Sequence, residues 1–233
     1  MKKTSSVELG SPIPLGTFPR GNGANLAFFS RHATRVRLEL FAHPEDQTPA
    51  RQIDLDPVLN RTGDVWHVQV DGIQPGQLYA YRVDGPWSPA EGQRFNFSRL
   101  LLDPYATAIS RPVKWDFDKA FGYDPSSPER DLVRANTDDA DAMPKCIITC
   151  KPFHWNFDQP LKQVWCTTLI YEMHVRGFTV NPNAGVQNPG TYSGLIEKIP
   201  YLKDLGVTAV ELMPVQEFNE NVRPLANYWG YDP

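Results

Sequence analysis

Hydrophobic and polar residues alternate with a period of two in three stretches of the first 84 residues. Such alternation is typical of antiparallel strands that bury one face. A shorter aromatic stretch precedes them, and turns rich in glycine and proline separate the runs. The pattern predicts an immunoglobulin-like β-sandwich of about 100 residues. The predicted strands are 24–30, 35–41, 64–70 and 77–83.

The alternation stops near residue 85, and the next stretch of the chain has a different character. Residues 99–104 predict one short helical turn that a proline stops. Residues 125–144 are polar and predict an exposed connection. Within them, Asp138, Asp139 and Asp141 form either a calcium loop or a solvated acidic cluster. The cluster is favoured, because the glycine and the distal glutamate of an EF-hand are missing.

A third pattern occupies the last seventy residues. Residues 168–175 are rich in β-forming side chains, and 207–215 form a second apolar run. Between them, apolar residues recur at helical spacing over 195–205, Pro200 interrupts the run, and Gly206 stands where a helix-ending glycine belongs. The order strand, helix, strand predicts a βαβ unit of a parallel sheet. One unit cannot cover both faces of such a sheet, so the predicted fold is incomplete.

Composition and charge narrow the possible functions. Of 233 residues, 41% are hydrophobic, which is enough for a folded core. The net charge of −4 argues against nucleic-acid and anionic-membrane partners. No apolar run approaches the roughly 18 residues of a membrane span, and the first ten residues lack the apolar centre of a signal peptide. Cys146, Cys150 and Cys166 predict reduced thiols in a cytoplasm, and their spacing is weak evidence for zinc.

Several motifs resemble those of a known family. Residues 171–179 (YEMHVRGFT) and 205–215 (LGVTAVELMPV) resemble the first two barrel strands of the α-amylase superfamily, and 227–233 (NYWGYDP) resembles the segment that follows. Upstream, four further motifs are similar to isoamylase-type glycogen-debranching enzymes, in which a glycogen- or starch-binding β-sandwich precedes a (β/α)8 barrel. These motifs lie at 14–16, 81–87, 94–96 and 102–106.

The resemblance implies an order of domains and an activity. It implies a glycogen- or starch-binding β-sandwich at 1–112, a connecting segment at 113–160, and the truncated opening of a TIM (β/α)8 barrel at 161–233. The implied activity of the parent enzyme is hydrolysis of α-1,6 branch linkages in glycogen or a related branched α-glucan, without a cofactor. The fold class is therefore a β-sandwich followed by an incomplete α/β barrel.

The groups that would cleave the bond are expected to be missing from this chain. Retaining hydrolysis needs two carboxyl groups about 5–5.5 Å apart. In this superfamily the catalytic carboxylates follow barrel strands four, five and seven, and only the first two strand motifs are present. We therefore expect no catalytic residue, no metal site and no activity of this chain alone. Two alternatives stay open: a non-catalytic α-glucan-binding module or truncated gene product, and an α-1,4-glucan branching enzyme. The oligomeric state is open as well.

Three aromatic residues are candidate substrate contacts. The resemblance makes Tyr231 a platform under a sugar ring, and an aromatic face suits the apolar face of a sugar. Trp87, in a proline-bounded turn, and Trp66, on an alternating strand face, are candidate glucan platforms. Packing is the alternative for all three residues, and it is the expected role of Trp229.

Polar residues of the two barrel-like strands have structural interpretations. Glu172 and Glu211 are expected to be buried carboxylates, each paired with a neighbour such as Arg176, because a buried charge must be paired. His174 is expected to be a packing residue, with a place near the substrate as the alternative.

Overall fold

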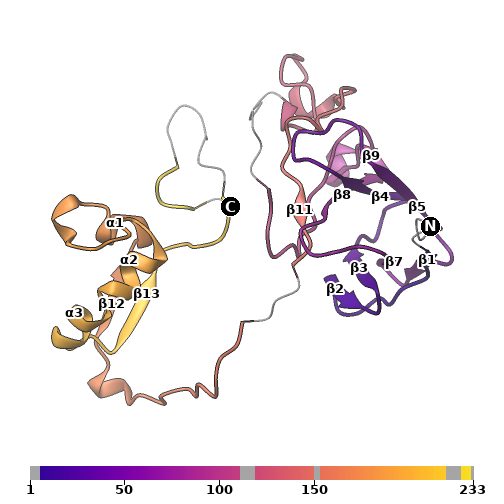
Figure 1. Cartoon of the computed structure of the whole chain (residues 1–233). Helices are drawn as coiled ribbons and strands as arrows, with labels where there is room; N and C mark the ends of the chain where they lie inside the picture. Colours follow the sequence, from indigo (N-terminus) through magenta and orange to yellow (C-terminus); the bar gives the residue numbers. More distant parts are fainter. Residues whose placement is uncertain (1–5, 111–118, 150–152, 219–226, 232–233) are drawn as a thin grey trace. The chain divides into compact units, whose positions relative to one another are not determined.

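The computed structural model describes residues 6–110, 119–149, 153–218 and 227–231. The chain forms two compact units, Met1–Phe153 and His154–Pro233 (Figure 1). The first unit is built mainly from antiparallel strands, and the second combines one parallel strand pair with short helices.

Two antiparallel sheets form the first unit. One has the order β1 (Val7–Glu8), β7 (Val65–Asp71), β3 (Gly23–Phe29) and β2 (Gly16–Arg20), and β6 (Arg61–Thr62) also pairs with β7. The other has the order β11 (Cys146–Ile147), β8 (Leu78–Asp84), β4 (Arg35–Phe41) and β5 (Arg51–Leu55). A small ribbon pairs β9 (Trp87–Ser88) with β10 (Gln93–Arg94). The four predicted strands are confirmed. Most of their ends are shifted by one residue.

The hydrophobic core lies between these two sheets. Phe28 of β3 pairs with Trp66 of β7, and Leu38 of β4 pairs with Tyr81 of β8. All four side chains belong to one buried cluster, and the rings of Phe28 and Tyr81 meet across the sheets with centroids 4.4 Å apart. Within each strand, the residues that alternate with these core residues point to the opposite face of the sheet. The period-two pattern therefore produced the predicted antiparallel sandwich.

A further layer covers the outer face of β4 and β8. Phe41, Leu78 and Ala80 face away from the sandwich core and are nevertheless buried, because Leu100 and Ala140 pack over them. The expectation that 125–144 is an exposed connection is therefore wrong for its last part, where Asp139, Ala140 and Ala142 are buried, whereas most of 125–134 is exposed. The helical turn expected at 99–104 is also absent, since Leu101 instead forms an isolated bridge with Tyr81.

The acidic residues of this layer have protein partners. Asp138 bonds to Arg82, and Asp141 bonds to Lys119 at 2.8 Å. Asp139 is only 1% exposed and accepts the Leu100 backbone N–H at 2.8 Å. The expectation of a solvated cluster is therefore wrong for Asp139, and the other two carboxylates are held in ion pairs.

Two of the sequence motifs hold the outer layer against the sandwich. The Asn96 amide donates to the carbonyl oxygens of Gly122 at 2.9 Å and Ala135 at 2.8 Å. The buried Asp103 carboxylate accepts the Tyr79 hydroxyl at 2.9 Å. These residues therefore have structural roles, which explains why the chain between 94 and 106 follows such a specific path.

The second unit contains the predicted parallel strand pair. Strand β12 (Ile170–Met173) pairs in parallel with β13 (Ala209–Leu212). The connection contains α1 (Val175–Thr179), α2 (Tyr192–Glu197) and α3 (Ile199–Asp204). The helix breaks between α2 and α3, with Pro200 in the first turn of α3, and Gly206 follows with φ +86°. The βαβ prediction is confirmed, although Val175 begins a helix and does not extend the strand.

Short 3₁₀ turns complete the described structure. They are Pro89–Glu91, Arg130–Leu132, Trp165–Thr167 and Pro182–Ala184. Among the described residues, no helix is long and apolar enough to cross a membrane.

Candidate functional site

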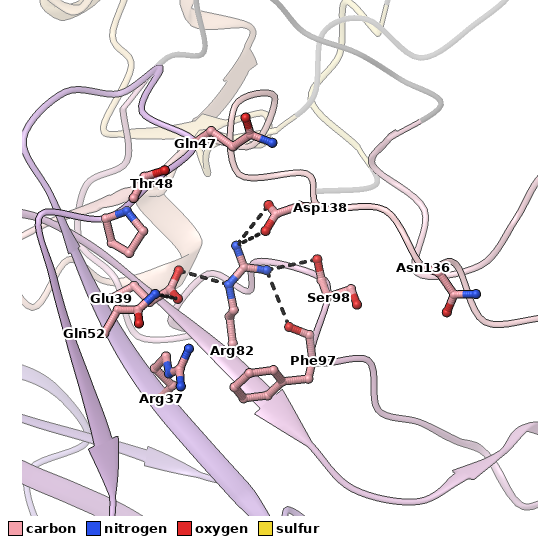
Figure 2. A pocket seen from close by; sticks show the side chains of 11 residues that line it. Arg37, Glu39, Gln47, Thr48, Gln52, Arg82, Phe97, Ser98, Asn136 and Asp138 are labelled. Atoms are coloured by element: carbon pink, nitrogen blue, oxygen red, sulfur yellow. Dashed lines mark hydrogen bonds and ion pairs between the residues drawn. The ribbon is translucent and has the colours of Figure 1, made fainter.

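A pocket of about 520 Å³ opens on the outer face of the sheet formed by β8, β4 and β5 (Figure 2). Its floor consists of strand residues that alternate away from the sandwich core. The β4–β5 loop forms one side, and the outer layer forms the other. The lining residues are Arg37, Glu39, Gln52 and Arg82 on the floor, Gln47, Thr48 and Pro49 on the loop, and Phe97, Ser98, Asn136 and Asp138 on the outer layer.

Arg82 organises the floor of this pocket. Its guanidinium is only 5% exposed and bonds in three directions, as Figure 2 shows. Nε donates to Glu39 at 3.0 Å, Nη1 to the Ser98 carbonyl at 2.9 Å, and Nη2 to both Asp138 oxygens at 3.0 and 2.9 Å. One side chain therefore joins the sheet to the outer layer and holds the outer-layer side of the pocket in place.

The second arginine of the floor is paired as well. Arg37 donates to both oxygens of Asp54, at 2.9 and 3.0 Å. This hydrogen bond, with the charges of Arg37 and Arg35, lowers the pKa of the Asp54 carboxyl against the opposing effect of burial. The cationic groups of the floor are therefore neutralised by carboxylates of the same unit, and the pocket offers no unpaired cation to an anionic ligand.

The remaining polar groups of the pocket are uncharged. Gln47, Thr48 and Asn136 are exposed on its sides. Gln52 uses its amide to donate to Glu39 at 3.2 Å. Phe97 adds an aromatic wall, and its ring is held by the Arg35 guanidinium 4.1 Å from the ring centroid. Amides, hydroxyls and an aromatic ring together suit a neutral ligand with many hydroxyl groups.

An aromatic cluster lies at the carboxyl end of β12 in the second unit. The His174 ring stacks on Tyr228 with centroids 4.5 Å apart, and its Nε2 lies 3.0 Å from the Tyr228 carbonyl oxygen. Its Nδ1 accepts the Gly177 backbone N–H at 3.0 Å, so the ring proton lies on Nε2 and is donated to Tyr228. The packing role expected for His174 is confirmed.

Gly177 makes room for this cluster. A Cβ atom at Gly177 would lie 2.9 Å from the Tyr228 hydroxyl oxygen, which is closer than real contacts allow. His174 and Gly177 thus form the packing site of the Tyr228 side chain. Trp229 meets the edges of His174 and Tyr228 and keeps 52% of its surface exposed, so packing is only part of its environment.

The three predicted substrate contacts have different environments. Trp66 is fully buried in the sandwich core and donates its indole N–H to the Ser30 carbonyl, so it offers no face to a glucan. Trp87 is half-buried in β9 and donates to the Leu132 carbonyl at 3.0 Å. Tyr231 is 56% exposed. The expectation of a platform therefore fails for Trp66 and stays a prediction for the other two.

The two strand glutamates differ from their expected environment. Glu172 and Glu211 are register partners on β12 and β13 and therefore share one face, yet both are exposed. The expectation of buried carboxylates paired with Arg176 is wrong. Elsewhere in the described part of the chain, no group of three His, Cys, Asp or Glu side chains is arranged to hold a metal ion.

Sequence reasoning did not identify the pocket. The alternation within 35–41 places Arg37 and Glu39 on the outer face of β4, and the same alternation places Arg82 on the outer face of β8. That signal was present in the sequence. The partner Asp138 could not be assigned, because it lies 56 residues from Arg82 in a segment without regular structure.

Comparison with known proteins adds independent information. Residues 14–106 match the family model of carbohydrate-binding module 48, the isoamylase N-terminal domain. A glycogen debranching enzyme of Serratia proteamaculans is 42% identical over 230 residues, covering 96% of this chain and 33% of the relative. A glycogen debranching enzyme of Yersinia enterocolitica is 41% identical over 235 residues, with 98% and 33% covered.

Solved structures agree on the fold. Pullulanase from Paenibacillus barengoltzii matches with a TM-score of 0.66 at 20% identity, covering 97% of this chain and 31% of that one. The catalytic module of the glycogen-degrading pneumococcal virulence factor SpuA matches with a TM-score of 0.62 at 24% identity, covering 90% and 28%. The chain spans about one third of the length of the curated relatives it matches. Residues 14–106 are therefore similar to carbohydrate-binding module 48, and the chain resembles glycogen-debranching enzymes over nearly its whole length.

Proposed function

We propose that this chain serves the hydrolysis of α-1,6 branch linkages in glycogen or a related branched α-glucan, as the part that recognises the glucan. The observation that carries the proposal is the 42% identity to a glycogen debranching enzyme over 96% of the chain. The match of residues 14–106 to a carbohydrate-binding module supports glucan binding by the first unit. The pocket lined by amides and a phenylalanine is compatible with that ligand.

We assign the second unit to the opening of an α-amylase-type barrel. The parallel pair β12–β13 with helices in its connection is the repeating unit of such a barrel. Active sites of these barrels lie at the carboxyl ends of the strands. His174 follows the last residue of β12, and Tyr231 lies three residues after Tyr228, which His174 holds. This placement supports Tyr231 as a platform for a sugar ring.

We propose that no carboxylate of this chain serves as a catalytic group of that hydrolysis. Glu172 and Glu211 are the carboxylates of the strand pair, and the resemblance gives neither a catalytic role. The proposed extents remain 1–112 for the glucan-binding sandwich, 113–160 for the connecting segment and 161–233 for the barrel portion. Within the second extent, described residues 119–149 pack on the sandwich and belong to the first compact unit.

A non-catalytic α-glucan-binding role is the second candidate. The observation that favours it is that the family match covers only the carbohydrate-binding module. A reducing, cytoplasmic location fits both candidates, because Cys146 and Cys166 are free thiols.

Sedimentation with glycogen tests recognition, and release of reducing ends tests hydrolysis. The purified chain is expected to sediment with glycogen in the ultracentrifuge and to stay in solution with dextran, whose α-1,6-linked backbone presents no α-1,4 chains. It is expected to release no reducing ends from pullulan above a blank. A chain that stays in the supernatant when glycogen sediments would contradict the binding role. Turnover that is lost in Glu172→Gln or Glu211→Gln would contradict the assignment of these residues.

A further inference from the structure

We propose that β7 and β3 carry a strand-binding site, which residues 6–13 occupy in this chain and which accepts an extended peptide of another chain in the same way. The site consists of the edge of β7 and the side chains of Asn25 and His67. In Figure 1, β1 lies beside β7 at the start of the described chain. The family match begins at residue 14, so the occupying segment lies outside it. This site does not depend on glucan recognition.

The edge of β7 holds the first part of the segment through its main chain. Strand β1 pairs with β7 in antiparallel register, with Val7 opposite Val70 and Glu8 opposite Gln69. The side chains of residues 6–9 are all exposed, and Val7 and Leu9 keep 44% and 54% of their surface in contact with solvent. Addition of a strand to a sheet edge uses main-chain hydrogen bonds, so exposed side chains contribute little to it.

Two buried side chains bind the segment where it leaves the edge. Asn25 is 2% exposed and makes two bonds to Ser11, since its Oδ1 accepts the backbone N–H at 2.6 Å and its Nδ2 donates to the carbonyl oxygen at 2.9 Å. His67 Nδ1 donates to the Leu9 carbonyl oxygen at 2.7 Å, because a carbonyl can only accept. Its Nε2 accepts the Thr62 hydroxyl at 2.9 Å. Both side chains therefore bind peptide groups, which a strand of any sequence presents.

Gly10 adds one sequence requirement. Its φ is +75°, and a Cβ atom there would lie 2.6 Å from the Val68 carbonyl carbon and 2.8 Å from the Gln69 nitrogen. A residue with a side chain would therefore clash with the backbone of β7 and adopt a strained conformation. The site fits an extended peptide that has a glycine at this position and variable residues at the exposed positions before it.

The occupant can be exchanged, because main-chain bonds and not buried side chains hold its first four residues. The covalent connection gives the chain's own segment an effective concentration of about a millimolar or more. A peptide of another chain therefore competes with it only when the chain's own segment is weakened. Variants that weaken the segment and leave the site intact make the site accessible to a direct test.

The test combines whole-chain variants with a synthetic peptide of residues 6–13 that carries a fluorophore at its carboxyl end. Gly10→Ala weakens the chain's own segment through the clash with β7. Ser11→Pro weakens it independently, because it removes the N–H that Asn25 accepts. Gly76→Ala is the matched control, since Gly76 has φ +91° but its Cβ would meet no described atom within 4 Å. Fluorescence anisotropy measures binding, and circular dichroism checks that each variant is folded.

Both weakened variants should bind the peptide with a dissociation constant on the order of 0.1 mM, about tenfold more tightly than the parent chain and Gly76→Ala do. A peptide with Gly10→Ala should bind about tenfold more weakly. A peptide with Val7→Ser and Leu9→Ser should bind within about twofold of the original, because both side chains are exposed.

Three results would overturn the inference. The first is equal binding by the parent and the weakened variants, or no binding by either weakened variant. The second is a Gly10→Ala peptide that binds as well as the original peptide. The third is loss of binding by the peptide with Val7→Ser and Leu9→Ser, which would mean that side chains and not the main chain are recognised.

Discussion

Arg82 offers the sharpest test of how the outer layer is held to the sandwich. In Arg82→Met, the side chain keeps its length and its apolar stem but loses the guanidinium. Glu39, which is only 1% exposed, then keeps the Gln52 amide at 3.2 Å as its remaining side-chain partner. Removing one member of a buried ion pair costs about 3–5 kcal/mol, because the other charge stays buried without compensation. That is a large fraction of the roughly 5–15 kcal/mol by which a domain is stable.

Urea unfolding, followed by circular dichroism of the whole chain, measures this cost. Arg94→Met is the matched control, because Arg94 forms an exposed ion pair with Asp131 at 2.8 Å and its loss should cost less than about 1 kcal/mol. The double variant Arg82→Met with Glu39→Leu should recover most of the loss, since no charge then stays buried alone.

Two results would refute the reasoning about Arg82. One is a cost for Arg82→Met that is as small as the cost for Arg94→Met, which would mean that Glu39 is solvated or protonated without penalty. The other is a double variant as unstable as the single one. In that case packing of the outer layer, and not the buried charge, would account for the effect.

Two further predictions concern stability and the aromatic cluster. Burial raises the pKa of Asp139 to about 6 from 3.8, against the opposing bond from the Leu100 N–H. Between these values the folded state binds more protons than the unfolded state. The carboxyl group therefore lowers the free energy of unfolding by its full amount above pH 6, and it has no such effect below pH 3.8. Asp139→Asn should therefore raise the free energy of unfolding by about 3 kcal/mol at pH 7 and by little at pH 4; an equal change in urea unfolding at both values would contradict this. His174→Ala should speed amide hydrogen exchange both over 227–231 and in α1, because it removes the ring that stacks on Tyr228 and the acceptor of the Gly177 N–H. His174→Asn should keep protection at Gly177, because asparagine can cap the helix, but it should not protect 227–231, because it does not stack on Tyr228. Unchanged exchange over 227–231 in both variants would show that the packing of Tyr228 on His174 does not hold this segment in place.

The strands were predictable because their pattern is local. In β4 and β8, Leu38 and Tyr81 face the core while Glu39 and Arg82 face outward, as period-two alternation requires. The same alternation could not tell which face of β7 points into the core between the two sheets, so Trp66 stayed ambiguous in the sequence. Pairing with Phe28 and the packing of the second sheet resolve it.

The outer layer was not predictable because its order comes from long-range contacts. Lys145 is completely buried and donates to the Pro44 carbonyl at 2.7 Å, across 101 residues of sequence. It also donates to the carbonyl oxygens of Ala140 and Met143. The stretch 125–145 is rich in proline, aspartate, serine and arginine and poor in large apolar residues, a composition typical of an exposed loop. The floor of the pocket follows from strand alternation, whereas its second wall depends on these distant partners.

The central claim is that the first unit recognises neutral α-glucan. Isothermal titration of the whole chain with maltoheptaose at 50 and 500 mM sodium chloride tests it most directly. The account predicts a dissociation constant on the order of millimolar that changes less than about twofold between the two salt concentrations, because stacking and uncharged hydrogen bonds are not screened. Absence of heat up to tens of millimolar maltoheptaose, or an affinity that falls steeply with salt, would contradict the claim.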